Sequence, residues 1–155
     1  MSTTPTTQAA FAAQRLLERN RVSATFFPAE SERLARACQS MAERFLRGGR
    51  LLAFGRGHYA TDAQHVSVEF VHPVIVGKRA LPALDLSLFF RDWLAALVQS
   101  DDMVMGFGPP ERDPEVTEAL RLAQSRGAQT VPMPSPSSDP YIHQELIEIV
   151  SHSVW

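Results

Sequence analysis

The sequence predicts an α/β domain in which helices cover both faces of a parallel sheet. Short apolar runs typical of buried strands recur at residues 50–54, 80–87, 102–107 and 128–133. Segments with helical periodicity separate these runs, and strands that alternate with helices normally pair in parallel and are covered on both sides. The length of 155 residues is that of one domain, so we expect residues 1–155 to form a single unit.

An N-terminal helical extension at about residues 5–47 precedes the first predicted strand. Apolar residues recur at helical spacing over residues 5–20 and again over residues 29–47, after Pro28. Proline disfavours a helix interior, so the sequence predicts two helices here. The glycine pair at residues 48–49 is expected to end the second.

The remaining helices are expected at residues 61–71, 88–100, 113–126 and 141–155. The 113–126 segment has the clearest ends, because Asp113 suits an N-cap, Pro114 the first helical position and Gly127 the residue past the end. His72 precedes Pro73, which predicts that the first of these helices ends there.

Composition excludes several classes of function. A net charge of −2 gives no electrostatic basis for binding nucleic acid or a membrane surface. No apolar run approaches the ~20 residues of a membrane-spanning helix, and residues 1–7 lack the features of a signal peptide. We therefore expect a cytoplasmic protein. Cys38 lies on an apolar helical stripe, which predicts a buried thiol. Because it is the only cysteine, an intramolecular disulfide is excluded.

Three segments carry candidate chemistry. The Gly-rich loop that starts at residue 55 follows a strand and precedes a helix, so it could present backbone N–H groups to an anion or simply form a tight turn. His65 and Glu69, four residues apart, share one helix face. They could be two metal ligands, an acid/base pair or an ordinary surface pair.

In the last predicted helix, Gln144, Glu148 and His152 recur every four residues. This pattern forms either part of a site or the polar face of an amphipathic helix. His58, His72 and His143 have no partner at a meaningful spacing, and we expect His143 to be exposed.

These segments together resemble the phosphoheptose isomerases, members of the sugar isomerase (SIS) group. That family has a G-N-G-G-S loop after a strand, then D-A-x-H, a Glu four residues after the His, P-A-I-A-L-S, and finally Q-E with a His eight residues after the Gln. The matching segments here are Gly55-Arg56-Gly57-His58-Tyr59, Asp62-Ala63-Gln64-His65, Glu69, Pro82-Ala83-Leu84-Asp85-Leu86-Ser87, Gln144-Glu145 and His152.

The resemblance implies a flavodoxin-like SIS fold and a homotetramer. It also implies that the two N-terminal helices pack in the oligomer and that the active sites lie at subunit contacts. It implies interconversion of sedoheptulose 7-phosphate and a heptose 7-phosphate through an enediol, with Glu69 and His152 as the proton-transfer pair. In some members the positions of His65, Glu69, Gln144 and His152 bind zinc. The substrate-binding positions would be Gly55, Arg56, Gly57, His58, Tyr59, Asp62 and Ser87, with Arg112 as a further cation.

The departures from the family pattern concern phosphate. Arg56 and Tyr59 replace Asn and Ser in the first loop, and the second loop reads GPPERD at residues 108–113 where the family has S-T-S-G-N-S. Its two prolines lack N–H donors and Glu111 repels an anion, although Arg56, His58 or Arg112 could compensate. The segment between the second and third strands, which is longer in the family and carries an N-D pair there, is only a single helix length here, residues 88–101.

Three functions therefore stay open. The first is an isomerase of a sugar or sugar phosphate, with or without zinc. The second is a diverged, non-catalytic SIS protein that serves as a metal-binding regulatory or accessory module and has lost the phosphate site. The third is a plain sugar-phosphate sensor, which would need a phosphate site that the sequence does not supply.

Overall fold

The structure, a computed structural model, describes residues 7–73 and 77–153. Its centre is a four-stranded parallel sheet in the order β2-β1-β3-β4. The strands are β1 (Leu51–Gly55), β2 (Ala83–Asp85), β3 (Met103–Phe107) and β4 (Gln129–Pro132). The helices are α1 (Thr7–Leu46), α2 (Ala60–Val71), α3 (Phe90–Leu97), α4 (Pro114–Ser125) and α5 (Pro140–Ser153), with a short 3₁₀ turn at Gly57–Tyr59.

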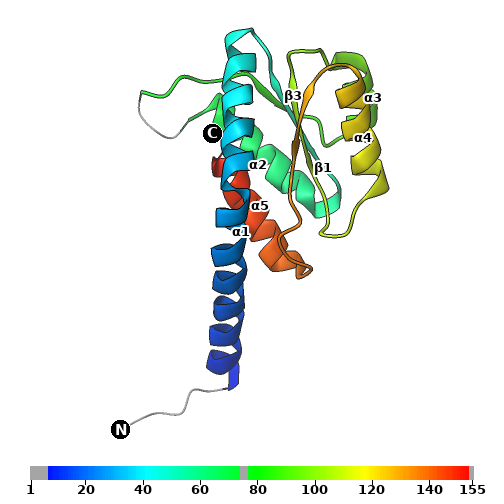
Figure 1. Cartoon of the computed structure of the whole chain (residues 1–155). Helices are drawn as coiled ribbons and strands as arrows, with labels where there is room; N and C mark the ends of the chain where they lie inside the picture. Colours follow the sequence, from blue (N-terminus) through cyan, green and yellow to red (C-terminus); the bar gives the residue numbers. More distant parts are fainter. Residues whose placement is uncertain (1–6, 74–76, 154–155) are drawn as a thin grey trace.

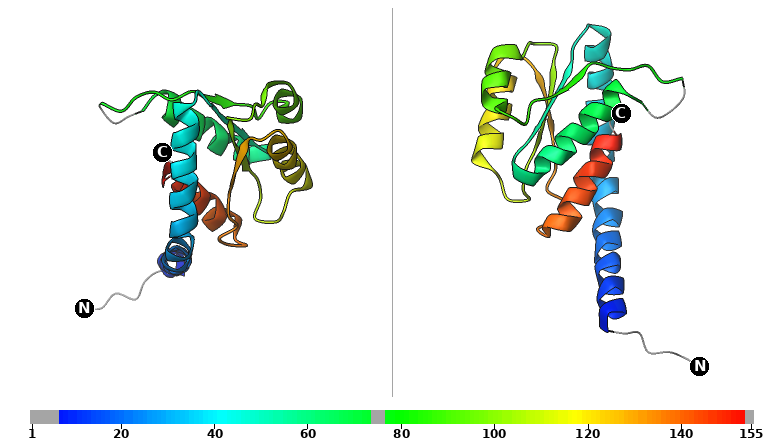
Figure 2. Two further views of the ribbon diagram at one scale, coloured as in Figure 1. Left: turned by 45° about the horizontal axis from the view of Figure 1, so that its top comes forward. Right: turned by 180° about the vertical axis from the view of Figure 1, so that it is seen from behind.

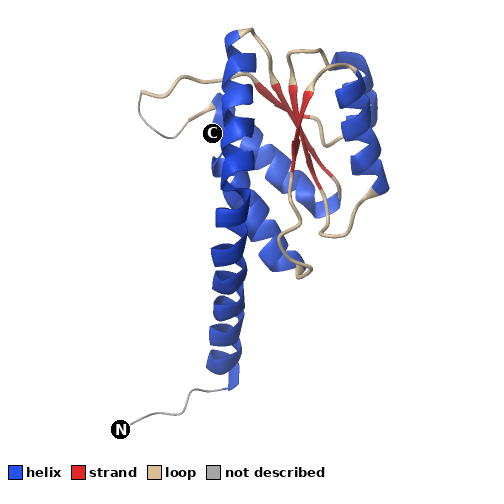
Figure 3. Ribbon diagram, in the orientation of Figure 1, coloured by secondary structure: helices blue, strands red, loops and turns tan. Residues whose placement is uncertain are grey.

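Helices cover both faces of the sheet, as predicted (Figures 1 and 3). On one face, Leu51 and Ala53 pack with residues of α1, α2 and α5. On the other face, Leu52 and Phe54 pack with α3 and α4. Because β1 is buried on both sides, its whole length is apolar rather than alternating.

Strand β2 is shorter than the predicted segment at residues 80–87. Pro82 has no N–H to add to a ladder. At the other end, Asp85 Oδ1 accepts hydrogen bonds from the backbone N–H and the hydroxyl of Ser87, at 3.0 and 2.5 Å. One more ladder hydrogen bond follows, from the Leu86 N–H to the Ala53 carbonyl oxygen at 2.7 Å, and the local turn then ends the pairing of β2 with β1.

The N-terminal region is one 40-residue helix, so the prediction of two helices was wrong. Proline removes one backbone hydrogen bond from a helix interior, but the chain continues helically through Pro28. The first half of α1 extends beyond the sheet (Figures 1 and 2). Ion pairs from Arg15 to Asp139, at 2.6 Å, and from Arg19 to Glu145 tie this half to the start of α5.

Helix α3 is shorter than the predicted segment at residues 88–100, whereas the predicted ends of α2 and α4 agree with the structure to within one residue. Asp113 caps α4 by accepting hydrogen bonds from the N–H groups of Glu115 and Val116, at 2.8 and 3.1 Å. Gly127 follows α4 with a φ of +86°, and His72 caps the end of α2. The last two residues of the predicted final helix, 154–155, lie outside the described part of the chain.

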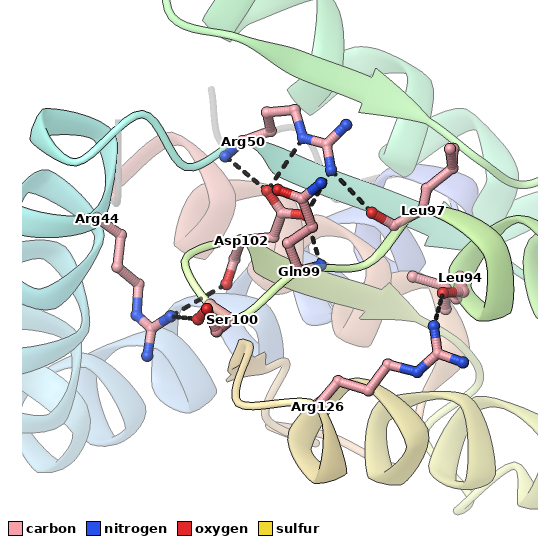
Figure 4. Close-up of polar contacts among 8 residues, drawn as sticks. All are labelled: Arg44, Arg50, Leu94, Leu97, Gln99, Ser100, Asp102 and Arg126. Atoms are coloured by element: carbon pink, nitrogen blue, oxygen red, sulfur yellow. Dashed lines mark hydrogen bonds and ion pairs between the residues drawn. The ribbon is translucent and has the colours of Figure 1, made fainter.

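A buried ion pair joins the amino-terminal ends of β1 and β3 (Figure 4). The Asp102 side chain, 2% exposed, pairs with Arg50 at 2.7 Å. It also accepts hydrogen bonds from the backbone N–H groups of Arg50 and Gln99, both at 3.0 Å. Arg44, near the end of α1, donates to the carbonyl oxygen of Ser100 at 2.5 Å and so attaches α1 to this corner.

Cys38 is only partly buried, so the expectation of a fully buried thiol was wrong in degree. It packs at the edge of the core, and Sγ lies 3.6 Å from the carbonyl oxygen of Ser153. Burial raises the pKa of the thiol. Within the described residues, no helix combines the length and apolarity needed to cross a bilayer.

Candidate active site and metal centre

Helices α2 and α5 lie on the same face of the sheet and bring three predicted site residues together (Figure 2). His65 and Glu69 come from α2, and His152 comes from the last turn of α5. Glu69 lies between the two imidazoles: Oε1 is 3.3 Å from His65 Nε2, and Oε2 is 3.5 Å from His152 Nε2. The two rings meet edge to face with centroids 5.0 Å apart.

This donor set fits a metal ion. One ligand atom from each of the three residues lies within 4.8 Å of the others. Zinc binds imidazole nitrogen and carboxylate oxygen at about 2.0–2.2 Å, which places neighbouring ligand atoms of a tetrahedral site about 3.3–3.5 Å apart. Each imidazole Nε2 lies at this spacing from one oxygen of the Glu69 carboxylate, Oε1 for His65 and Oε2 for His152. The same arrangement also suits a carboxylate and an imidazole that exchange protons with a bound substrate.

Gln144, the fourth predicted ligand, has another partner in this structure. Its amide nitrogen donates to both carboxylate oxygens of Asp62, at 3.1 and 3.3 Å. Asp62 is buried, and burial raises the pKa of its carboxyl although the hydrogen bond from Gln144 opposes that shift. The pair therefore joins α2 to α5 beside the three-residue cluster.

Glu148 is a site residue that the sequence reasoning missed. Its carboxylate Oε1 is 2.8 Å from His65 Nδ1, and its backbone carbonyl oxygen is 2.7 Å from Nδ1 of His152. The sequence did place Glu148 on the face shared by Gln144 and His152. That spacing was the available signal, but it could not show which residue of α2 Glu148 would meet.

His143 is buried, so the expectation that it is exposed was wrong. Asp139 caps the start of α5, and this start directs residue 143 toward the sheet. Nε2 lies 3.0 Å from the carbonyl oxygen of Gly108, and the ring meets Tyr59 edge to face at 5.9 Å. Burial lowers the pKa of the imidazole.

Known proteins similar to this chain include phosphoheptose isomerases. No family model matches the chain. The phosphoheptose isomerase of Pelobacter propionicus is 34% identical over 114 residues, which cover 63% of this chain and 60% of that protein. The phosphoheptose isomerase of Solidesulfovibrio magneticus is 33% identical over 124 residues, which cover 70% and 61%.

The chain is thus similar in sequence to phosphoheptose isomerases over part of their length. Its matches span about 60% of the length of these two curated relatives. The phosphoheptose isomerase structures from Neisseria gonorrhoeae and Francisella tularensis superpose with TM-scores of 0.85 and 0.87, at 19% and 16% identity. Each superposition covers 96% of both chains. The SIS fold expected from the resemblance is therefore confirmed.

In the first loop, the groups predicted to meet the substrate mostly contact other protein groups. Arg56 pairs with Asp113 and Glu115, both at 2.8 Å, and the hydrogen bond to Asp113 raises the pKa of the guanidinium. His58 stacks on the buried Tyr59, with ring centroids 4.2 Å apart. Arg56 would have to leave two carboxylates to bind a phosphate.

The glycines and Ser87 hold the turn itself. Gly55 allows the chain to fold back, because a Cβ there would lie 2.0 Å from the carbonyl oxygen of Tyr59. Gly57 has a φ of +63°, and the Gly55 N–H donates to the Ser87 hydroxyl at 3.0 Å. Arg112 lies instead beside α4, at a cavity of about 400 Å³ that His143 also lines.

Proposed function

We propose that this protein is an isomerase that interconverts an aldose and a ketose, as sugars or sugar phosphates, through an enediol intermediate. The observation that carries the proposal is the position of the Glu69 carboxylate between the Nε2 atoms of two imidazoles. The names of its curated relatives, phosphoheptose isomerase, support the class of reaction.

The reaction moves one proton between neighbouring carbons and another between their oxygens. We assign Glu69 as the base that removes the proton from the carbon next to the carbonyl. His152, protonated, donates from Nε2 to the carbonyl oxygen and so forms the enediol. Glu69 then returns its proton to the adjacent carbon while His152, now neutral, accepts the proton of the other hydroxyl, which gives the isomer. Each positioned acid or base contributes roughly 10²–10⁴-fold to such a reaction.

His65, Glu69 and His152 would hold a zinc ion, and Gln144 would join them by turning from Asp62. A bound metal supplies polarisation of the carbonyl and charge stabilisation for the enediolate. Glu69 cannot be a tight ligand and a free base at once. Glu69 can therefore abstract a proton only when its carboxylate is not tightly bound to a metal ion.

We further propose a cytoplasmic homotetramer with sites at subunit contacts. The first half of α1 extends away from the sheet and exposes Phe11, Leu16 and Leu17 by 65%, 62% and 69%. Large apolar side chains gathered on one exposed segment are typical of protein contacts. A second copy of α1 would cover them, and sedimentation or light scattering of the purified chain measures the assembly.

The test is turnover of sedoheptulose 7-phosphate in deuterium oxide, followed by NMR. We expect the aldose to appear with deuterium on the carbon that receives the returned proton. Glu69→Gln should lower the rate by roughly 10²-fold or more, because the amide cannot accept the proton. Glu118→Gln is the matched control, since Glu118 is exposed on α4 and pairs only with Arg91 among the ion pairs described. Equal rates for the Glu69 and Glu118 variants would remove Glu69 from the mechanism.

A second function, a non-catalytic metal-binding accessory module, is favoured by the loop at residues 108–113 and by the ion pairs of Arg56. Both observations weaken phosphate recognition without touching the three-residue cluster. A panel of phosphorylated and unphosphorylated ketoses and aldoses separates the two functions. Zinc binding with no turnover on any of them supports the accessory module.

A further inference from the structure

Both imidazoles of the cluster are held by the same residue of α5. His65 Nδ1 lies 2.8 Å from the Glu148 carboxylate, and His152 Nδ1 lies 2.7 Å from the Glu148 backbone carbonyl oxygen. A carbonyl or carboxylate oxygen can only accept, so each Nδ1 carries the proton of its hydrogen bond. In neutral imidazoles this leaves a lone pair on Nε2.

Each of those Nε2 atoms lies on the side of Glu69. The Glu69 carboxylate also only accepts, so without a metal ion it competes with Glu148 for a proton of His65. The contact with Glu148 is the shorter of the two, 2.8 Å against 3.3 Å, and favours the proton on Nδ1. The opposite tautomer would direct an N–H of His65 toward Glu69 and would leave Nδ1 with no proton to share with Glu148. A carboxylate that fixes the tautomer of a ligating histidine raises the basicity of its other nitrogen.

We propose that Glu148 is a positioning residue that holds His65 as the Nδ1-protonated tautomer, with Nε2 available at the site. The inference rests on the proposed function for its purpose, since a metal ion or a substrate would use that Nε2. It assigns to Glu148 a role outside the matching residues of the family pattern. The side chains of Glu148 and His65 are 41% and 43% exposed, so removal of the carboxylate should leave the core intact.

The first test reads the tautomer directly in metal-free protein. Histidine labelled with ¹⁵N distinguishes a protonated ring nitrogen from an unprotonated one by NMR. We expect His65 to carry a proton on Nδ1 in the wild type. In Glu148→Ala we expect that proton to be lost from Nδ1 in favour of Nε2, where Glu69 is the remaining acceptor. His152 is an internal control, because its Nδ1 partner is a backbone carbonyl that the substitution keeps. An unchanged His65 tautomer would overturn the proposal.

The second test measures zinc affinity by competition with a chromophoric chelator. Loss of a carboxylate partner of a ligating histidine weakens metal binding about 10–100-fold, which we expect for Glu148→Ala. Glu148→Gln keeps an acceptor oxygen and should lose less. Glu145→Ala is the matched control, since Glu145 lies on the same helix but pairs with Arg19. An affinity of Glu148→Ala equal to that of the control would overturn the proposal.

The two tests separate this inference from the proposed function. If wild-type protein binds no zinc, the metal part of the proposed function fails, while the tautomer of His65 still decides the role of Glu148. Thermal unfolding followed by circular dichroism establishes that the Glu148 variants are folded.

Discussion

Asp101 and Asp102 are adjacent carboxylates in very different surroundings, and this difference sets a quantitative prediction. Asp102→Ala should destabilise the protein by about 3–5 kcal/mol, the usual cost of removing one partner from a buried ion pair. Its side chain is 2% exposed and pairs with Arg50, whose side chain is 28% exposed. The backbone N–H groups of Arg50 and Gln99 lose their acceptor as well, which favours the upper part of that range.

Asp101→Ala is the matched control. Asp101 pairs with Arg47 at 2.8 Å, but the two side chains are 46% and 51% exposed. Exposed pairs contribute about 1 kcal/mol or less. For a chain of this length, each kcal/mol shifts the unfolding midpoint by about 2–4 °C, so Asp102→Ala should unfold about 6–20 °C below the wild type.

The assay is urea and thermal unfolding of all three proteins by circular dichroism, at one protein concentration so that any assembly affects them equally. If Asp102→Ala loses no more stability than Asp101→Ala, the Arg50–Asp102 pair does not hold the two central strands together, and the reasoning from burial is wrong.

Two further predictions concern the site's surroundings. Burial lowers the pKa of His143 in the folded protein. The stability that the neutral His143 contributes is therefore complete above the unfolded pKa of about 6.5 and declines as the pH falls through the lower, folded pKa. His143→Gln should flatten the acid side of the plot of unfolding free energy against pH, measured by urea unfolding, and an unchanged slope would contradict this. Gly55→Ala would place a Cβ 2.0 Å from the Tyr59 carbonyl oxygen and should cost about 2 kcal/mol or more, whereas Gly108→Ala, whose Cβ meets Val116 at 3.3 Å, should cost less in the same unfolding assay.

The sheet could be predicted because its central strands are buried on both faces. Residues 51–54 and 103–105 are continuous apolar runs, and such runs between amphipathic helices indicate parallel strands. The prediction of two N-terminal helices was wrong because it took Pro28 as a helix break. The cost of one missing backbone hydrogen bond does not by itself end a helix. The apolar stripes before and after it belong to one continuous α1.

The site was predictable where residues on one helix share a face, and less so where two helices meet. The spacing of His65 and Glu69 reflects helix geometry alone. Whether Gln144 or Glu148 reaches His65 depends on how α5 lies against α2, which a sequence pattern does not contain. In the structure, Gln144 hydrogen-bonds to Asp62 and Glu148 contacts His65. The same limit explains the wrong expectation for His143.

Under the proposed function, the departures from the family pattern fall in the loops and not in the proton-transfer residues. Proton transfer at two neighbouring carbons needs a base and an acid at that point, and the cluster of His65, Glu69 and His152 lies between α2 and α5. The loops in which the family resemblance predicts phosphate contacts follow β1 and β3, and there Arg56 is engaged by Asp113. Because these loops and the cluster are made of different residues, loss of phosphate contacts would weaken the hold on a substrate without changing the reacting groups. A neutral or differently anchored sugar would then bind more weakly but could still react at the cluster. Comparison of KM with kcat for each sugar of the panel separates weaker binding from slower proton transfer.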